Sequence, residues 1–216
     1  VCMYIVVEGM PGTGKSTIAK GLSKKIGYEY KKSSLSNTNY GLKIRSLINQ
    51  GNYEEEVEYF YLIDLLFDEM AINSILSKNK GVVRDKCFSS NSAYMKIFNC
   101  AVKDKKCSEL IIEGYSKIKN EARKPDIVVY LEPNFEKVLK GLDTKSDTSE
   151  WDKYIIEHKN EYFKQEREMK KELNEVYGDR LLTIESFSKD VDAMVDEIIE
   201  KCKIIMVREN ARERSK

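Results

Sequence analysis

The chain has 216 residues, of which 34% are charged and 41% hydrophobic, and its formal net charge is +1. This length suits one well-buried α/β domain, and the near-zero charge gives no general attraction for nucleic acid or an anionic membrane surface. Five cysteines without metal-ligand spacing favour reduced thiols and a cytoplasmic location. We therefore expect neither nucleic acid nor a membrane as partner.

Apolar spacing predicts alternating strands and helices along the chain. The first strand, residues 4–7, leads through a glycine-rich turn into a helix that ends at Gly27. Further strands are expected at 28–32, 82–85, 126–131 and 180–184. Further helices are expected at 41–49, 54–77, 89–102, 110–118, 135–142, 151–177 and 191–202, with a strand as the alternative at 110–118. This order predicts a three-layer α/β fold, a five-stranded parallel sheet with helices on both faces.

The chain is expected to form a single domain over residues 1–205, followed by a charged tail at 206–216. The mixed charges of residues 208–216 predict a frayed end, with binding of a partner as the alternative. A lid segment is expected at about residues 141–153, because its centre is polar and lacks an apolar anchor. Lids of this kind close over nucleotide phosphates and exclude water. An ordinary surface loop would have the same composition.

Residues 9–16 fit G-x-x-x-x-G-K-[ST], the phosphate-binding loop. Backbone N–H groups of such a loop hold anionic oxygens, and the N-terminus of the following helix adds a positive dipole end. Lys15 would bring a point charge to the β and γ phosphates, and Ser16 a hydroxyl ligand for Mg²⁺. The residues expected to contact the nucleotide are Gly9, Pro11, Gly12, Thr13, Gly14, Lys15, Ser16 and Thr17.

Polar residues at the carboxyl ends of the strands are the next candidates, because ligands of parallel sheets bind at that edge. They are Glu8, Lys31, Lys32, Asp85, Lys86 and Glu132. Asp85 ends a buried strand beside the phosphate loop, where a carboxylate can hold Mg²⁺ or accept a proton from an attacking hydroxyl. A helix N-cap or a solvated aspartate of a loop is the alternative role for Asp85.

Four stretches in this order resemble the thymidylate kinase family, within the nucleoside and nucleoside monophosphate kinases. They are EGMPGTGKST at 8–17, GLKIRSLI at 41–48, DKCFSSNSAY at 85–94 and KPDIVVYLEP at 124–133. The resemblance implies a P-loop kinase fold, ATP with Mg²⁺ as donor and a nucleotide as phosphoryl acceptor. It implies catalytic roles for Lys15, Asp85 and Lys86, Mg²⁺ ligation by Ser16 and Asp85, and substrate binding by Lys32, Arg45, Tyr61, Asp64 and Tyr94. A homodimer is left open.

The chain departs from the family pattern on the acceptor side. Pro11 replaces the loop aspartate, Ser33 stands near the position of a phosphate-clamping arginine, and Leu65 replaces the base-reading arginine. Lys86 replaces the arginine of D-R-Y, and Lys145 is the nearest cation in the expected lid. A lysine neutralises phosphate without the planar fork of arginine. The acceptor therefore stays open between a nucleoside monophosphate and a deoxynucleoside 5′-hydroxyl, with a non-catalytic nucleotide-binding regulator as a further alternative.

Overall fold

The computed structural model of the protein describes residues 3–32, 39–52, 55–98, 113–114, 116–144, 146 and 148–213. Five parallel strands form one sheet in the order β2-β3-β1-β4-β5. The strands are β1 (Tyr4–Gly9), β2 (Glu29–Lys31), β3 (Val82–Asp85), β4 (Ile127–Glu132) and β5 (Leu181–Glu185). The predicted five-stranded parallel sheet is therefore confirmed.

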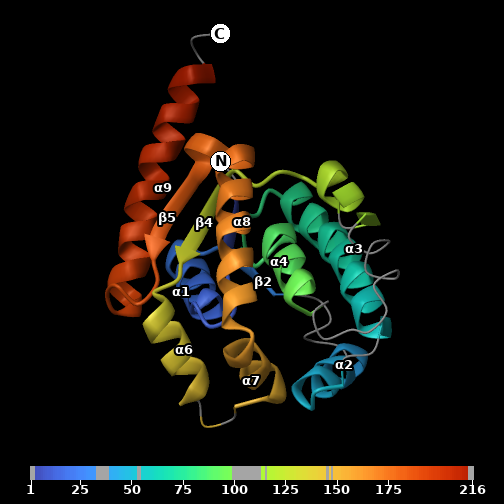
Figure 1. The fold of residues 1–216 in the computed structure, drawn as a ribbon. Coiled ribbons are helices and arrows are strands. Elements are labelled where there is room, and N and C mark those ends of the chain that lie inside the picture. Colours follow the sequence, from blue (N-terminus) through green and yellow to red (C-terminus); the bar gives the residue numbers. More distant parts are fainter. Residues whose placement is uncertain are drawn as a thin grey trace.

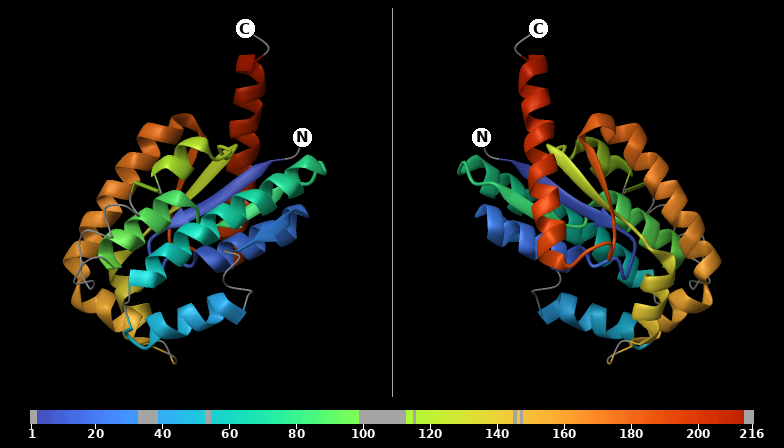
Figure 2. Two further views of the ribbon diagram at one scale, coloured as in Figure 1. Left: turned by 90° about the vertical axis from the view of Figure 1, so that its right-hand side faces the viewer. Right: turned by 90° about the vertical axis from the view of Figure 1, so that its left-hand side faces the viewer.

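Helices cover both faces of this sheet (Figures 1 and 2). The β1 side chains explain the two layers, because successive residues of a strand point to opposite faces. Ile5 and Val7 pack in the cluster with α1 and α9, whereas Tyr4 and Val6 pack in the cluster under α3. The helices are α1 (Lys15–Ile26), α2 (Asn39–Asn49), α3 (Glu55–Ser77), α4 (Phe88–Phe98), α6 (Phe135–Asp143), α7 (Glu150–Glu157), α8 (Lys159–Tyr177) and α9 (Val191–Glu213).

Two stretches predicted to be helical reach beyond the described residues. Residues 113–114 and 116–121 are helical, which confirms the helix over the strand for the described part of 110–118. The part of the predicted helix 89–102 that follows Phe98 lies outside the described residues. In the expected lid segment, α6 ends at Asp143 and α7 begins at Glu150, while Lys145 lies outside the described residues. Closure of this segment stays a prediction.

The single helix predicted for 151–177 is wrong, because the chain leaves the helical conformation at His158. This residue has φ −102° and ψ 34°, and it separates α7 from α8. The imidazole ring of His158 stacks on the Tyr154 ring with centroids 3.9 Å apart. The backbone N–H of His158 donates to the Tyr154 carbonyl at 2.9 Å. The break lets α7 pack against α6 and α2 while α8 packs along α4 and the sheet. Apolar periodicity does not detect one residue that leaves the helical region.

The frayed tail predicted for the C-terminus is also wrong through Glu213, because α9 continues to that residue. Residues 203–213 contain neither glycine nor proline, so no residue in this stretch breaks the helix. The end of α9 extends beyond the rest of the fold (Figure 2).

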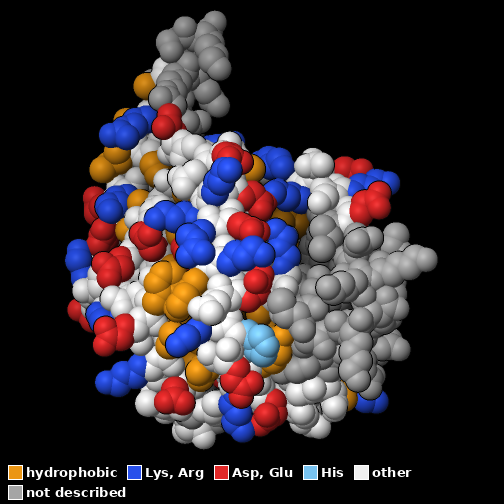
Figure 3. Space-filling view, viewed as in Figure 1, with side chains coloured by type: hydrophobic (Ala, Val, Ile, Leu, Met, Phe, Trp, Pro, Cys, Tyr) orange, Lys and Arg blue, Asp and Glu red, His pale blue; other side chains and the backbone are white. Residues whose placement is uncertain are grey.

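The surface agrees with the small net charge. Figure 3 shows basic and acidic side chains interspersed on the face that α8 crosses. In the described part of the chain, no helix has the length and apolarity that a membrane crossing requires.

Candidate functional site

The loop between β1 and α1 depends on glycines at two positions with positive φ. Gly12 has φ 83°, and a Cβ added there would lie 2.9 Å from Cγ1 of Val138. Gly14 has φ 82° and is the N-cap of α1, where its carbonyl accepts the Thr17 N–H at 3.0 Å. L-residues with side chains rarely adopt this conformation. The loop therefore has the backbone shape that the sequence motif predicts.

Lys15 lies at the base of the loop and is 8% exposed. Its Nζ donates to the Met10 carbonyl at 2.7 Å and lies 5.3 Å from the centroid of the Tyr94 ring. Burial lowers the pKa of Lys15 to about 8; the nearby Lys86 charge lowers it too, while Asp85 and Glu8 oppose the shift. The negative charge of a bound phosphate would offset the cost of burying this ammonium group.

Asp85 faces the phosphate loop across the sheet. Parallel pairing places it opposite Val7, and its Oδ2 accepts hydrogen bonds from Ser16 Oγ at 2.5 Å and from the Tyr30 hydroxyl at 3.0 Å. Burial, and then the Asp85 charge, raises the pKa of Tyr30, so this phenol stays protonated as a donor. Hydroxyl and carboxylate oxygens are the ligands that Mg²⁺ prefers, and the donor set of Ser16 and Asp85 fits that ion.

The N-cap alternative for Asp85 is not supported. A different carboxylate, that of Glu8, accepts the N–H groups of Cys87 and Ser90 at the start of α4. Glu132 also has a structural partner, since it forms an ion pair with Lys170 of α8.

A cavity of about 230 Å³ opens beside Lys15 and Asp85. It brings together residues from the phosphate loop, the end of β3, α2, α4 and α7, which are far apart in the sequence. Its lining is Pro11, Gly12, Lys15, Ser16, Lys32, Gly41, Ile44, Arg45, Asp85, Lys86, Tyr94, Trp151 and Asp152. Gly9, Thr13, Gly14 and Thr17 belong to the same loop but do not line this cavity.

Cations gather on the walls of this cavity. Lys86 has φ 60°, its N–H donates to the Val7 carbonyl at 2.9 Å, and its Nζ lies 5.4 Å from the Tyr94 ring centroid. Burial, and then the Arg45 charge, lowers the pKa of Lys32. An anionic ligand would relieve this repulsion between like charges.

The structure does not test two of the predicted substrate-binding residues, Tyr61 and Asp64. Both belong to α3, but their side chains are not among those that the structure describes. Their roles in substrate binding stay predictions.

Residues 151 and 152 of α7 line the cavity. They lie in the expected lid segment and at the start of a predicted helix, but neither was predicted as a site residue. Asp152 and Ser149 form a capping box at the start of this helix, and the S-x-x-D pattern at 149–152 is the sequence signal for it. Trp151 stacks on Tyr154 with ring centroids 5.6 Å apart. No sequence pattern singled out the Trp151 side chain as part of the cavity wall.

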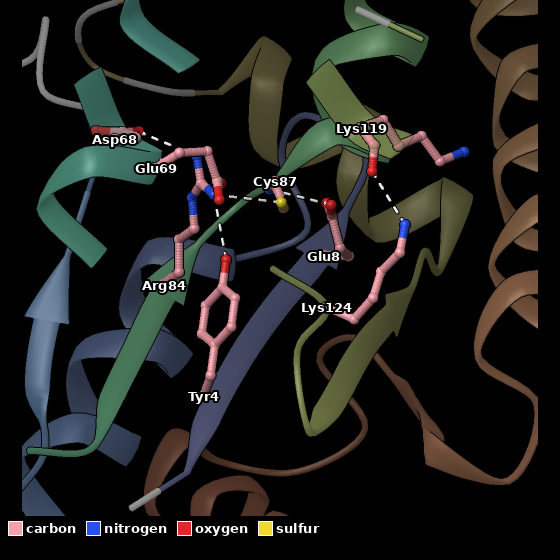
Figure 4. Close-up of polar contacts among 8 residues, drawn as sticks. All are labelled: Tyr4, Glu8, Asp68, Glu69, Arg84, Cys87, Lys119 and Lys124. Atoms are coloured by element: carbon pink, nitrogen blue, oxygen red, sulfur yellow. Dashed lines mark hydrogen bonds and ion pairs between the residues drawn. The ribbon is translucent and has the colours of Figure 1, made fainter. Parts of the chain in front are cut away.

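A buried ion cluster beside the site was also missed (Figure 4). Arg84 is 1% exposed on β3, and its guanidinium donates to Glu69 Oε1 at 2.5 Å and to Asp68 Oδ2 at 3.3 Å. It also donates to the Tyr4 hydroxyl at 3.2 Å. The cluster attaches α3 to the strand that ends in Asp85. Two adjacent carboxylates within an apolar helix stretch were the sequence signal for it.

A sequence model of the family described as thymidylate kinase matches residues 7–198. A probable thymidylate kinase of Methanocaldococcus jannaschii is 30% identical over 203 residues, covering 91% of this chain and 94% of the relative. The solved thymidylate kinase of Candida albicans is similar with a TM-score of 0.72 and 16% identity, covering 97% of this chain and 93% of its own. The solved deoxyadenosine kinase from M. mycoides with bound dATP is similar with a TM-score of 0.66 and 20% identity, covering 93% of this chain and 100% of its own. These two structures share the fold.

Proposed function

Because the chain belongs to the thymidylate kinase family, it is a phosphotransferase of the nucleotide kinase class, and we propose that it transfers the γ-phosphoryl group of ATP to a nucleoside monophosphate. The observation that carries the proposal is that one cavity has two groups of polar side chains on its walls. Lys15, Ser16 and Asp85 form the donor side. Two cations, Lys32 after β2 and Arg45 on α2, form the acceptor side.

The donor side would bind ATP with Mg²⁺. Lys15 offers a buried charge to the β and γ phosphates, while Ser16 and Asp85 offer oxygen ligands to the metal ion. Bound Mg²⁺ supplies charge neutralisation and orientation of the triphosphate. Lys86 would lie beside the group in transfer and neutralise its developing negative charge. Catalysis then consists of positioning and electrostatic stabilisation by these side chains.

On the acceptor side, Lys32 and Arg45 would bind the phosphate of the monophosphate. The Lys32 pKa is depressed by burial and by the Arg45 charge, so a dianion between them would stabilise both cations. This pair would take over the work of the arginine that is missing near Ser33. A phosphate oxygen is already an anion at neutral pH and needs no general base. The contacts of Asp85 with Ser16 and Tyr30 are compatible with such a reaction, since the carboxylate is kept for the metal ion.

A deoxynucleoside is the second candidate acceptor. The arginine-poor acceptor side and the shared fold with deoxyadenosine kinase favour it. In that reaction, a 5′-hydroxyl would attack, and Asp85 would accept its proton. The two candidates therefore differ in what Asp85 does.

The experiment is a panel of nucleosides and nucleoside monophosphates, dTMP and thymidine included, assayed for acceptor-dependent ADP production. We expect production with at least one monophosphate and none above ATP hydrolysis with Lys15→Ala. A matched control is Lys25→Ala, which removes a surface lysine of the same helix that pairs with Asp196. Activity with nucleosides alone would establish the second candidate, and ATP binding without any acceptor would establish a non-catalytic nucleotide-binding protein.

A further inference from the structure

Among the described contacts at the start of helix α4, no side chain of the helix itself caps it. Cys87 is the N-cap residue, since its carbonyl accepts the Asn91 N–H at 3.2 Å and the helix starts at Phe88. Serine, threonine, aspartate and asparagine are the usual residues at this position because their oxygens accept helix N–H groups. A thiol is a weak acceptor. The first N–H groups of α4 therefore need a partner from elsewhere.

Glu8 of β1 supplies that partner, although it lies 79 residues from Cys87 in the sequence. Its Oε1 accepts the Cys87 N–H at 3.0 Å, and its Oε2 accepts the Ser90 N–H at 3.3 Å and the Ser90 hydroxyl. A local capping box satisfies the same two backbone groups, at the N-cap and three residues later. Figure 4 shows Glu8 reaching from β1 toward Cys87. Glu8 is 2% exposed, and its carboxylate lies at the positive end of the α4 dipole.

Further bonds tie the same helix end to the phosphate loop. The Gly9 N–H donates to Ser90 Oγ at 3.3 Å, and the Tyr94 hydroxyl donates to the Gly9 carbonyl at 3.2 Å. Two residues, Lys86 and Cys87, connect β3 to α4, and the Lys86 N–H donates to the Val7 carbonyl. The connection that carries Asp85 and Lys86 is therefore held by β1 at both of its ends.

We propose that Glu8 is a positioning residue for phosphoryl transfer, which caps α4 from β1 and thereby fixes Asp85 and Lys86 relative to Ser16 and Lys15. This inference rests on the proposed function. Without the carboxylate, the N-terminus of α4 loses its acceptors, and the two-residue connection loses its fixed place beside the loop. A small displacement of charged groups around a transferring phosphoryl group has a large effect on rate.

The test is Glu8→Gln, which keeps the size of the side chain and replaces one acceptor oxygen by an NH₂ group. We expect kcat to fall by at least about tenfold, while KM for ATP changes little, because the loop and Lys15 remain. Backbone hydrogen exchange over residues 85–91 should become faster in the same variant. Tyr4→Phe is the matched control: it removes a buried hydroxyl from the neighbouring Arg84 cluster, and it should lower stability without lowering kcat.

A second substitution separates capping from general structural damage. Cys87→Ser gives α4 a local N-cap, so Glu8→Gln/Cys87→Ser should regain most of the lost kcat and slow the exchange again. Absence of transfer by the wild-type chain would refute the proposed function. Transfer by the wild type with unchanged kcat and exchange in Glu8→Gln would refute the positioning role alone, as would a double variant that stays as slow as Glu8→Gln.

Discussion

Ser16 donates a 2.5 Å hydrogen bond to Asp85, and this bond joins the first turn of α1 to the end of β3. The two residues are 69 positions apart in the sequence, yet parallel pairing of β1 with β3 brings them together. In this arrangement the hydroxyl and the carboxylate face one cavity and can share one metal ion. The pair can therefore be tested by replacing its carboxylate.

Asp85→Asn should lower kcat by at least about tenfold and raise the Mg²⁺ concentration for half-maximal activity, because an amide would replace the charged carboxylate that we propose as a metal ligand. ATP affinity should fall less than kcat. Tyr30→Phe is the control, since it removes the other hydrogen bond to the same carboxylate oxygen without removing a proposed ligand. Equal losses of ATP binding and turnover in Asp85→Asn would argue for a purely structural carboxylate.

ATP affinity should decrease as the pH rises through about 8. The folded protein lowers the pKa of Lys15 from its ordinary value of 10.5, so the amine loses its proton in this range and its attraction for phosphate disappears. Below that range the amine is fully charged, so its protonation should cause no further change of ATP affinity with pH. Calorimetric titration of a non-hydrolysable ATP analogue between pH 7 and 9 measures the effect. Lys15→Met should flatten the curve; a wild-type curve that is equally flat would contradict the assignment.

Gly12→Ala should abolish measurable ATP binding. The added Cβ meets Val138 in a backbone conformation with φ 83°, so the loop must move. Gly27→Ala is the matched control, because Gly27 has φ 70° but nothing within 4 Å of the added Cβ. It should cost about 1–2 kcal/mol of stability, because alanine must adopt the left-handed conformation, and leave ATP affinity unchanged. Equal ATP affinities in the two variants would show that the loop tolerates a side chain at residue 12.

Arg84→Met should lower the free energy of unfolding by about 3–5 kcal/mol, because Asp68 and Glu69 would be left buried without their cation. Urea denaturation measures this loss. Adding Asp68→Asn and Glu69→Gln to Arg84→Met should recover part of it, since the buried like charges are then removed. A loss below about 1 kcal/mol, typical of an exposed ion pair, would mean that the cluster is hydrated in solution.

Trp151 provides a direct probe of the cavity because it is the single tryptophan of the chain. It lines the cavity and lies within the expected lid segment at about residues 141–153. Its emission should change when an ATP analogue and a monophosphate bind together, and change less with either alone, if the lid closes over both. Identical spectra in all states would contradict closure around Trp151.

The phosphate loop could be predicted from the sequence because its function lies in consecutive residues. Two glycines with positive φ, a lysine and a serine define the loop within one short stretch. Asp85 could also be predicted, since a residue that ends a buried parallel strand must reach the edge where the loop lies. In both cases local chemistry and sheet geometry were sufficient.

The other parts of the site depend on contacts that local patterns do not encode. The bond between Ser90 and Glu8 spans 82 positions. Position at the end of a strand predicts Glu8 as a cavity residue, whereas its hydrogen bonds place it at the start of α4. Trp151 reaches the cavity because His158 ends α7 and lets that helix pack against α2. Hydrophobic periodicity also does not predict ion pairs in the protein interior, such as those of Arg84.

Whether Lys32 and Arg45 bind the phosphate of a monophosphate acceptor is measured most directly with the best monophosphate acceptor of the panel and the corresponding nucleoside. The measured quantity is the ratio of kcat/KM for the monophosphate to kcat/KM for the nucleoside, in the wild type and in Lys32→Ala/Arg45→Ala. We predict a high wild-type ratio, which falls by at least about a hundredfold in the double variant, because two charge-assisted contacts are lost. A ratio that stays unchanged, or a wild type that prefers the nucleoside, would contradict this role of the two cations.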